Sequence, residues 1–105
     1  MRQGDKAQLF VKKYLRKGYD KEYGTCHVSV WKYEAREACI YFILENEELT
    51  NVSLDIIYGC DICSEGEKTS CTGRVKERYY NELGKILKFE IENGFYKITL
   101  NSVDK

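Results

Sequence analysis

The sequence predicts an all-β fold, a small antiparallel barrel of about six to seven strands. Apolar residues recur at every second position through most of the chain, which is the period of a half-buried strand. Turn signals interrupt this alternation about every ten residues, a spacing typical of sandwiches and barrels. Proline is absent and nine tyrosines are present, and tyrosine suits such strands because its ring packs while its hydroxyl reaches water.

The individual strands follow from this alternation, and the loops follow from the polar stretches between them. The charged stretch 15–22 and the polar stretch 45–50 are predicted as loops. Residues 37–44 are apolar almost throughout, which favours a strand buried on both faces. The strands expected in order are 6–14, 23–33, 37–44, 53–64, 68–80, 85–92 and 95–100.

Glycines mark the expected turns. Glu65-Gly66-Glu67 predicts one hairpin, since glycine accepts the positive φ that a tight turn needs. Asn93-Gly94 is the stronger signal and predicts a second hairpin with a type I′ turn. The stretch 81–84 is also predicted as a turn, and Gly73 inside the strand 68–80 predicts a bulge or a sharp bend.

Length and charge limit the classes of function. The 105 residues suit a single domain spanning 1–105. Lys plus Arg and Asp plus Glu are 17 each, so the formal net charge is zero and we expect neither nucleic acid nor membrane as a partner. No apolar run suits a signal peptide or a membrane helix, and five cysteines are an odd set for a disulfide framework. We therefore expect a cytoplasmic protein.

The Cys60-x-x-Cys63 spacing is the feature most suggestive of chemistry, and with Cys71 and His27 it offers donors for zinc. Residues three apart on a strand point to opposite faces, however, so we expect Cys60 and Cys63 to diverge. The single histidine, His27, likewise diverges from its neighbour Cys26 on a strand, which leaves no nucleophile with an adjacent base. The sequence thus predicts no metal, no cofactor and no enzyme.

One basic stretch is flanked by tyrosines. Arg74, Lys76, Arg78 and Tyr80 alternate along the strand 68–80, so we expect them to share a face. Such a ladder suits an anion or a stacked base. The other interpretation is an exposed face whose cations pair with glutamates of the next strand, such as Glu90 and Glu92. Both interpretations stay open, with the paired face favoured.

The stretch 53–100 combines Ile57-Tyr58-Gly59 at the end of a strand, a tightly turned pair over 61–78 that contains Gly73-Arg74-Val75, and a final hairpin over 85–100. In this order the chain resembles the small β-barrel that precedes the PilZ domain in flagellar-brake-type proteins of bacterial cyclic-di-GMP signalling. The resemblance implies an interaction module. PilZ domains themselves bind the nucleotide through RxxxR and a later D/NxSxxG. Arg74 and Arg78 have the spacing of RxxxR, but no D/NxSxxG follows them in this sequence. We therefore do not predict that Arg74 or Arg78 binds cyclic-di-GMP.

We therefore expect a non-catalytic cytoplasmic interaction module that contacts another protein through a barrel face or an exposed edge. The alternative is a barrel that binds a nucleotide or another phosphate-bearing ligand on the face of Arg74, Lys76 and Arg78. Free arginine side chains would favour the alternative, and arginines paired with carboxylates would favour the interaction module.

Overall fold

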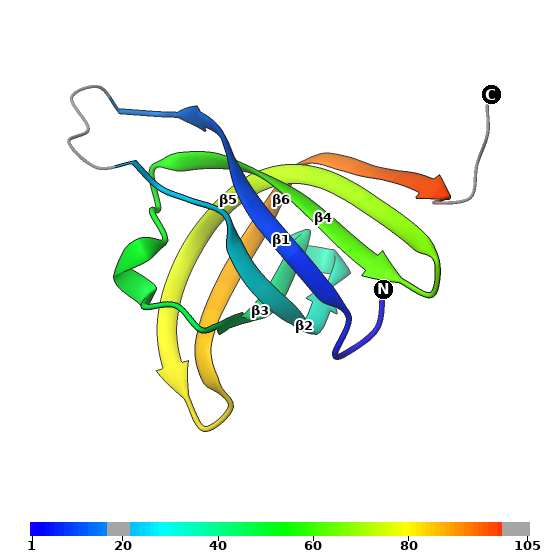
Figure 1. Cartoon of the computed structure of the whole chain (residues 1–105), viewed down its shortest axis with the longest axis horizontal. Helices are drawn as coiled ribbons and strands as arrows, with labels where there is room; N and C mark the ends of the chain where they lie inside the picture. The colour runs from blue at the N-terminus through cyan, green and yellow to red at the C-terminus, as the bar shows by residue number, and fades with distance from the viewer. Residues whose placement is uncertain (17–21, 100–105) are drawn as a thin grey trace.

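Six antiparallel strands close into a barrel in the computed structural model, which describes residues 1–16 and 22–99, the last five by their backbone (Figure 1). The strand order around the ring is β1-β2-β3-β6-β5-β4, and pairing of β1 with β4 closes it. The prediction of an all-β barrel is confirmed. Two short 3-10 turns, η1 (Ala35–Glu37) and η2 (Leu49–Asn51), flank β3. The strands are β1 (Lys6–Tyr14), β2 (Cys26–Glu34), β3 (Cys39–Glu45), β4 (Ile56–Ser64), β5 (Glu67–Asn81) and β6 (Gly84–Thr99).

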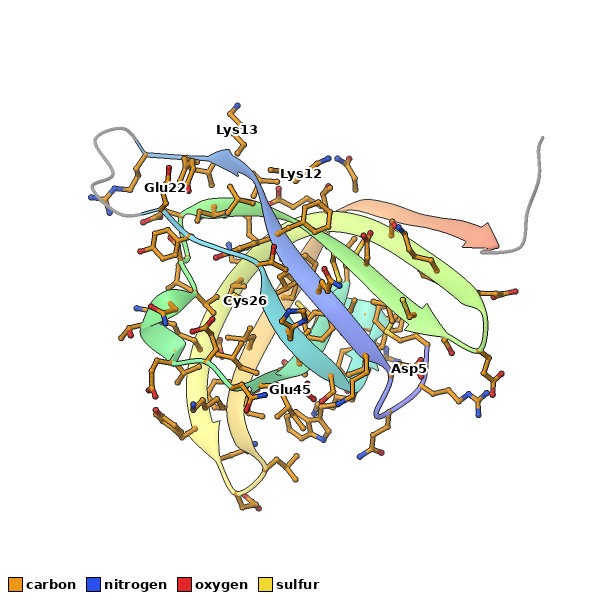
Figure 2. All side chains as sticks on the ribbon, viewed as in Figure 1. Asp5, Lys12, Lys13, Glu22, Cys26 and Glu45 are labelled. Carbon is orange, nitrogen blue, oxygen red and sulfur yellow. The ribbon has the colours of Figure 1, made fainter. Side chains whose placement is uncertain are left out.

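Alternate side chains of every strand fill the barrel, while charged side chains such as Lys12 and Lys13 project outward (Figure 2). The rings of Phe42 and Phe89 meet inside with centroids 5.8 Å apart. Each fully buried large apolar side chain contributes about 1.5–3 kcal/mol, so this interior is the main source of stability. Within the described residues, no helix is long and apolar enough to cross a bilayer. The largest fully buried side chains are Tyr58, Phe42, Phe89, Leu9, Ile40, Ile56, Ile62, Ile86, Leu87, Val28, Val52 and Val75.

Two of the three predicted turns are confirmed. Ser64 pairs with Glu67, and the two residues between them have positive φ angles of 52° and 82°, as a type I′ turn requires. Asn81 pairs with Gly84 at the other end of β5, where the Leu83 amide donates to Asn81 Oδ1 at 2.8 Å. Both hairpins follow from local turn chemistry.

The third turn, predicted at Asn93-Gly94, is wrong. β6 runs through both residues without reversing, and Gly94 lacks the positive φ that the turn would need. The cause is β5, which spans 15 residues and offers a partner along this whole length, with Thr72 opposite Asn93. The register between β5 and β6 shifts on either side of Thr72, where extra residues form bulges. The predicted strands 85–92 and 95–100 are therefore one strand, β6, as far as Thr99. Residues 17–21 of the predicted loop and residue 100 lie outside the described residues.

The connection between β3 and β4 adds to the core at one end of the barrel (Figure 1). Leu49 and Val52, within and just after η2, belong to the buried cluster. The Ser53 amide donates to the buried Tyr58 hydroxyl at 3.0 Å, which ties the connection to β4. This segment therefore packs as part of the barrel.

We expect the barrel to lose stability at alkaline pH, because two buried groups of the core resist deprotonation in the folded state. Burial raises the pKa of Tyr58 to about 12 and that of Cys26 to about 11. In the unfolded chain these groups titrate near 10 and 8.5, at lower pH than in the folded barrel. Above pH of about 9 the unfolded state therefore binds fewer protons, so stability falls as pH rises, by up to about 1.4 kcal/mol per pH unit for each group. Urea unfolding across this range measures the slope, and Tyr58→Phe should make it shallower above pH of about 10. An identical slope in the variant would contradict the assignment.

Candidate functional site

β5 carries the residues predicted to form a binding face, but the strand is not regular. A β-bulge makes Lys76 an extra residue with no register partner on β6. Before the bulge Arg74 lies opposite Glu90, and after it Arg78 lies opposite Leu87, which is fully buried in the core. Residues opposite each other on antiparallel strands share a face, so the two arginines lie on different faces. The prediction of one shared face is wrong because the bulge shifts the alternation by one residue.

Both arginines donate to the connection between β3 and β4. Arg74 Nη2 lies 3.0 Å from the Leu54 carbonyl oxygen. Arg78 Nη1 lies 3.1 Å from the Leu49 carbonyl oxygen and also contacts that of Val52. These contacts are neither the free guanidinium groups nor the carboxylate pairs considered from the sequence. The arginines hold the segment that covers the end of the barrel.

The other two residues of the predicted face have different surroundings. Lys76 Nζ lies 3.8 Å from a carboxylate oxygen of Glu90, the cross-strand pairing that the sequence suggested. Tyr80 is 65% exposed near the tip of the β5–β6 hairpin. The structure thus does not gather the four residues into one pocket.

The cysteines separate as the strand geometry predicted. Cys60 is buried in the core and Cys63 is exposed, so their placement on opposite faces is confirmed. Inside the barrel Cys60 lies directly opposite Cys71. A hydrogen bond with Cys71, together with burial, raises the pKa of Cys60, which keeps this thiol neutral. In the described residues, no three His, Cys, Asp or Glu side chains are placed to hold a metal ion.

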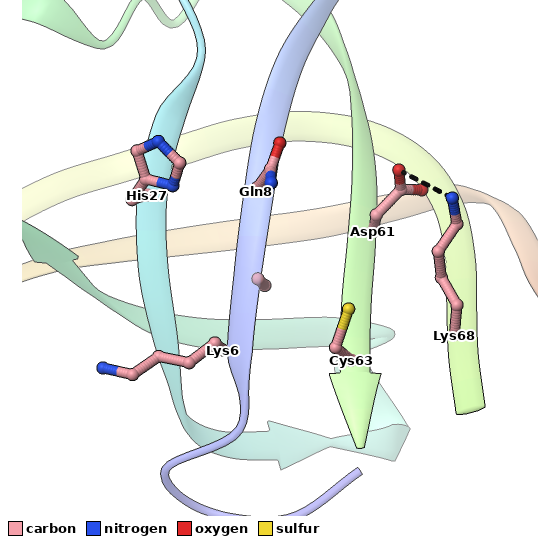
Figure 3. Close-up of a pocket in the computed structure, with 7 residues that line it drawn as sticks. Lys6, Gln8, His27, Asp61, Cys63 and Lys68 are labelled. Carbon is pink, nitrogen blue, oxygen red and sulfur yellow. Dashed lines mark ion pairs between the residues drawn. The ribbon is translucent and has the colours of Figure 1, made fainter. Parts of the chain in front are cut away.

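A shallow polar cleft of about 280 Å³ lies on the outer face of the barrel (Figure 3). Strand pairing builds it, because Gln8 on β1 lies between His27 on β2 and Asp61 on β4. In the next row the exposed Cys63 lies between two lysines, one on β1 and one on β5. The sequence offered no signal for this grouping, which depends on long-range pairing. The cleft is lined by Lys6, Ala7, Gln8, His27, Asp61, Cys63 and Lys68.

Ion pairs occupy most of the charges in this cleft. Lys68 Nζ lies 3.5 Å from Asp61, which also accepts a hydrogen bond from Ser70 at 2.7 Å. Lys6 hydrogen-bonds Glu45 at 2.6 Å and thereby lowers the pKa of that carboxyl. His27 and Asp61 are two strand spacings apart, about 10 Å, because β1 runs between them. The carboxylate opposite His27 is instead that of Glu45 on β3, and this carboxylate is paired with Lys6.

The far half of β6 presents an edge of the sheet. β3 pairs with β6 only from Ile86 to Glu90, and one further hydrogen bond joins the Ile91 amide to the Ala38 carbonyl at 2.8 Å. Beyond Ile91, β6 continues to Thr99 with β5 on one side and, among the described residues, no strand on the other (Figure 1). Such an edge leaves backbone N–H and C=O groups ready to pair with another chain.

These three surfaces differ in which polar groups remain available to a partner. The arginine contacts serve the barrel itself, ion pairs involve both lysines of the polar cleft, and the β6 edge beyond Ile91 has no strand partner among the described residues. Comparison of the chain with protein-family models, with curated proteins and with solved structures found no match.

Proposed function

We propose that this protein is a non-catalytic, cytoplasmic interaction module that binds an extended segment of another protein along the free edge of β6. The observation that carries the proposal is a mismatch in length. β6 has 16 residues, whereas β3, its neighbour on that side, has seven. In strand addition the backbone hydrogen bonds of such an edge supply affinity, and the adjacent side chains supply selectivity.

The shape of this edge supports a selective partner over indiscriminate self-pairing. The register of β6 against β5 shifts on either side of Asn93, which bends and twists the strand there. Natural sheets use bulges of this kind to restrict edge-to-edge aggregation. Glu92 and Asn93 are exposed beside the bulge, and a Cβ added at Gly94 would meet nothing within 4 Å. An incoming segment therefore has room to approach the backbone.

The alternative function, binding of a nucleotide or another phosphate-bearing ligand, has less support. Arg74 and Arg78 already donate to backbone carbonyl oxygens, and Lys76 pairs with Glu90. A phosphate would have to displace these contacts and would meet two arginines on different faces of β5. A role in cyclic-di-GMP signalling stays a prediction that rests on the sequence resemblance alone.

Site-specific photo-crosslinking in the native cell tests the proposal. With p-benzoylphenylalanine in place of Glu92, we expect a discrete adduct with another protein, because this exposed residue adjoins the free edge. The matched control places the same crosslinker at His27, an exposed strand residue on β2 in the polar cleft. Adducts from His27 alone, or none from Glu92, would contradict binding at the β6 edge.

Calorimetric titration of the purified protein provides the second arm of this experiment. We expect no heat of binding with cyclic-di-GMP or simple nucleotides, since Arg74 Nη2 and Arg78 Nη1 already donate to backbone carbonyl oxygens. Heat that disappears on Arg74→Ala would instead establish the ligand-binding alternative. Thermal melting of the variant shows whether the barrel is still folded.

A further inference from the structure

Two aromatic rings form a corner on the outer surface of β2 and β3. The Trp31 and Tyr41 rings meet edge to face, with centroids 5.7 Å apart and planes at 80°. Both side chains are half-buried, so their positions are set by packing while part of each ring still faces solvent. Two ring faces at a right angle present their negative electrostatic surfaces to the same small volume.

A β-bulge in β2 creates this corner. Val30 lies opposite Phe42 and Lys32 lies opposite Tyr41, so Trp31 is an extra residue with no register partner on β3. In a regular strand Trp31 and Lys32 would point to opposite faces. The bulge places both on the outer face beside Tyr41.

The corner already holds an ammonium group. Lys32 Nζ lies 4.5 Å from the centroid of Trp31 and 4.8 Å from that of Tyr41. One carboxylate adjoins it, since Glu34 lies 4.0 Å from the same nitrogen. Glu37 accepts a hydrogen bond from the Tyr41 hydroxyl at 3.2 Å and is itself paired with Lys88 at 3.7 Å. Aromatic faces and nearby negative charge favour the binding of a cation that has an apolar surface.

We propose that this corner is a binding site for the alkylammonium group of a partner molecule, and that Lys32 fills it when the partner is absent. The Lys32 side chain is 43% exposed, so it can leave without disturbing the core. A quaternary or methylated ammonium gives up less hydration than a primary ammonium and gains the same attraction from the rings. The proposal stands apart from the β6 edge and does not depend on it.

The single tryptophan of the chain makes the test direct, because all tryptophan fluorescence comes from Trp31. Tetramethylammonium chloride is titrated into the wild-type protein and into Lys32→Ala at constant ionic strength. We expect a saturable change in both, with half-saturation at about tenfold lower concentration in Lys32→Ala, because a tethered competitor has been removed. The matched control Lys12→Ala removes a lysine that lies 5.9 Å from the Phe10 ring, and it should behave as wild type.

A neutral probe separates charge from shape. tert-Butyl alcohol resembles tetramethylammonium in shape but lacks its charge, so we expect no saturable response to it. An equal response to the alcohol, or identical curves for wild type and Lys32→Ala, would overturn the proposal. Adding Tyr41→Leu to Lys32→Ala should abolish the response to tetramethylammonium. Circular dichroism shows whether this double variant is folded. If it is not, the comparison of tetramethylammonium with tert-butyl alcohol in Lys32→Ala is the test of the proposal.

The same assay in Lys32→Ala distinguishes the two sources of an alkylammonium group. Tighter binding of a short trimethyllysine peptide than of choline would indicate a modified side chain of another protein. Equal or tighter binding of choline would indicate a small quaternary amine. Failure of both to bind would overturn the proposal without affecting the crosslinking test of the β6 edge.

Discussion

Replacing Gly73 by alanine is expected to destabilise the barrel by about 3 kcal/mol or more, which is at the upper end of overpacking substitutions. A Cβ at this position would lie 2.0 Å from the carbonyl oxygen of Glu90 and 3.0 Å from Cζ of Phe89. The obstacle is the backbone of β6, which pairs with β5 at this point through Gly73 and Ile91. Relief therefore requires the two strands to separate locally. Chemical unfolding followed by circular dichroism measures the loss.

Two other glycines serve as controls for this substitution. The three atoms nearest to a Cβ at Gly59 all belong to the Phe10 ring, a side chain that can rotate, so the loss in Gly59→Ala should be smaller. A Cβ at Gly24 meets nothing within 4 Å, and Gly24→Ala should be neutral or stabilising by about 0.5 kcal/mol. Equal stability of the Gly73→Ala and Gly24→Ala variants would contradict the close approach of β5 and β6.

Replacing Arg78 by methionine is expected to cost about 2–3 kcal/mol, because the substitution removes a charged donor from two backbone carbonyls at the end of the barrel. Methionine keeps much of the apolar stem, so the loss reports the hydrogen bonds more than the packing. We expect faster amide exchange across 49–55, the segment that Arg78 holds. Chemical unfolding and hydrogen exchange measured by mass spectrometry give the two readouts.

Lys76→Met is the matched control for Arg78→Met. Lys76 precedes Arg78 by two residues but makes an exposed ion pair with Glu90, so its loss should cost no more than about 0.5 kcal/mol. An Arg78→Met variant with unchanged stability and exchange would contradict the structural role. If the same variant also lost a measurable affinity for nucleotide, the ligand-binding alternative would gain support.

Features that depend on neighbouring residues could be predicted from the amino-acid sequence. Alternation located β1 at 6–14 and predicted that Cys60 and Cys63 lie on opposite faces, because the side-chain period of a strand is two. Turn chemistry located the Glu65-Gly66 hairpin, and an isolated glycine within a strand indicated the irregular register beside Gly73. The class of fold followed from these local signals taken together.

Which distant residues meet depends on strand pairing across the barrel, and local sequence signals do not predict it. The long partner strand β5 overrode the turn preference of Asn93-Gly94, because continuous pairing satisfies more backbone groups than one reversal. Bulges at Trp31 and Lys76 changed which side chains face outward, since a shift of one residue moves every later side chain to the other face. The arginine contacts at the barrel end and the aromatic corner on its outer face both depend on such shifts, which arise from pairing across the barrel and leave no mark in the local sequence.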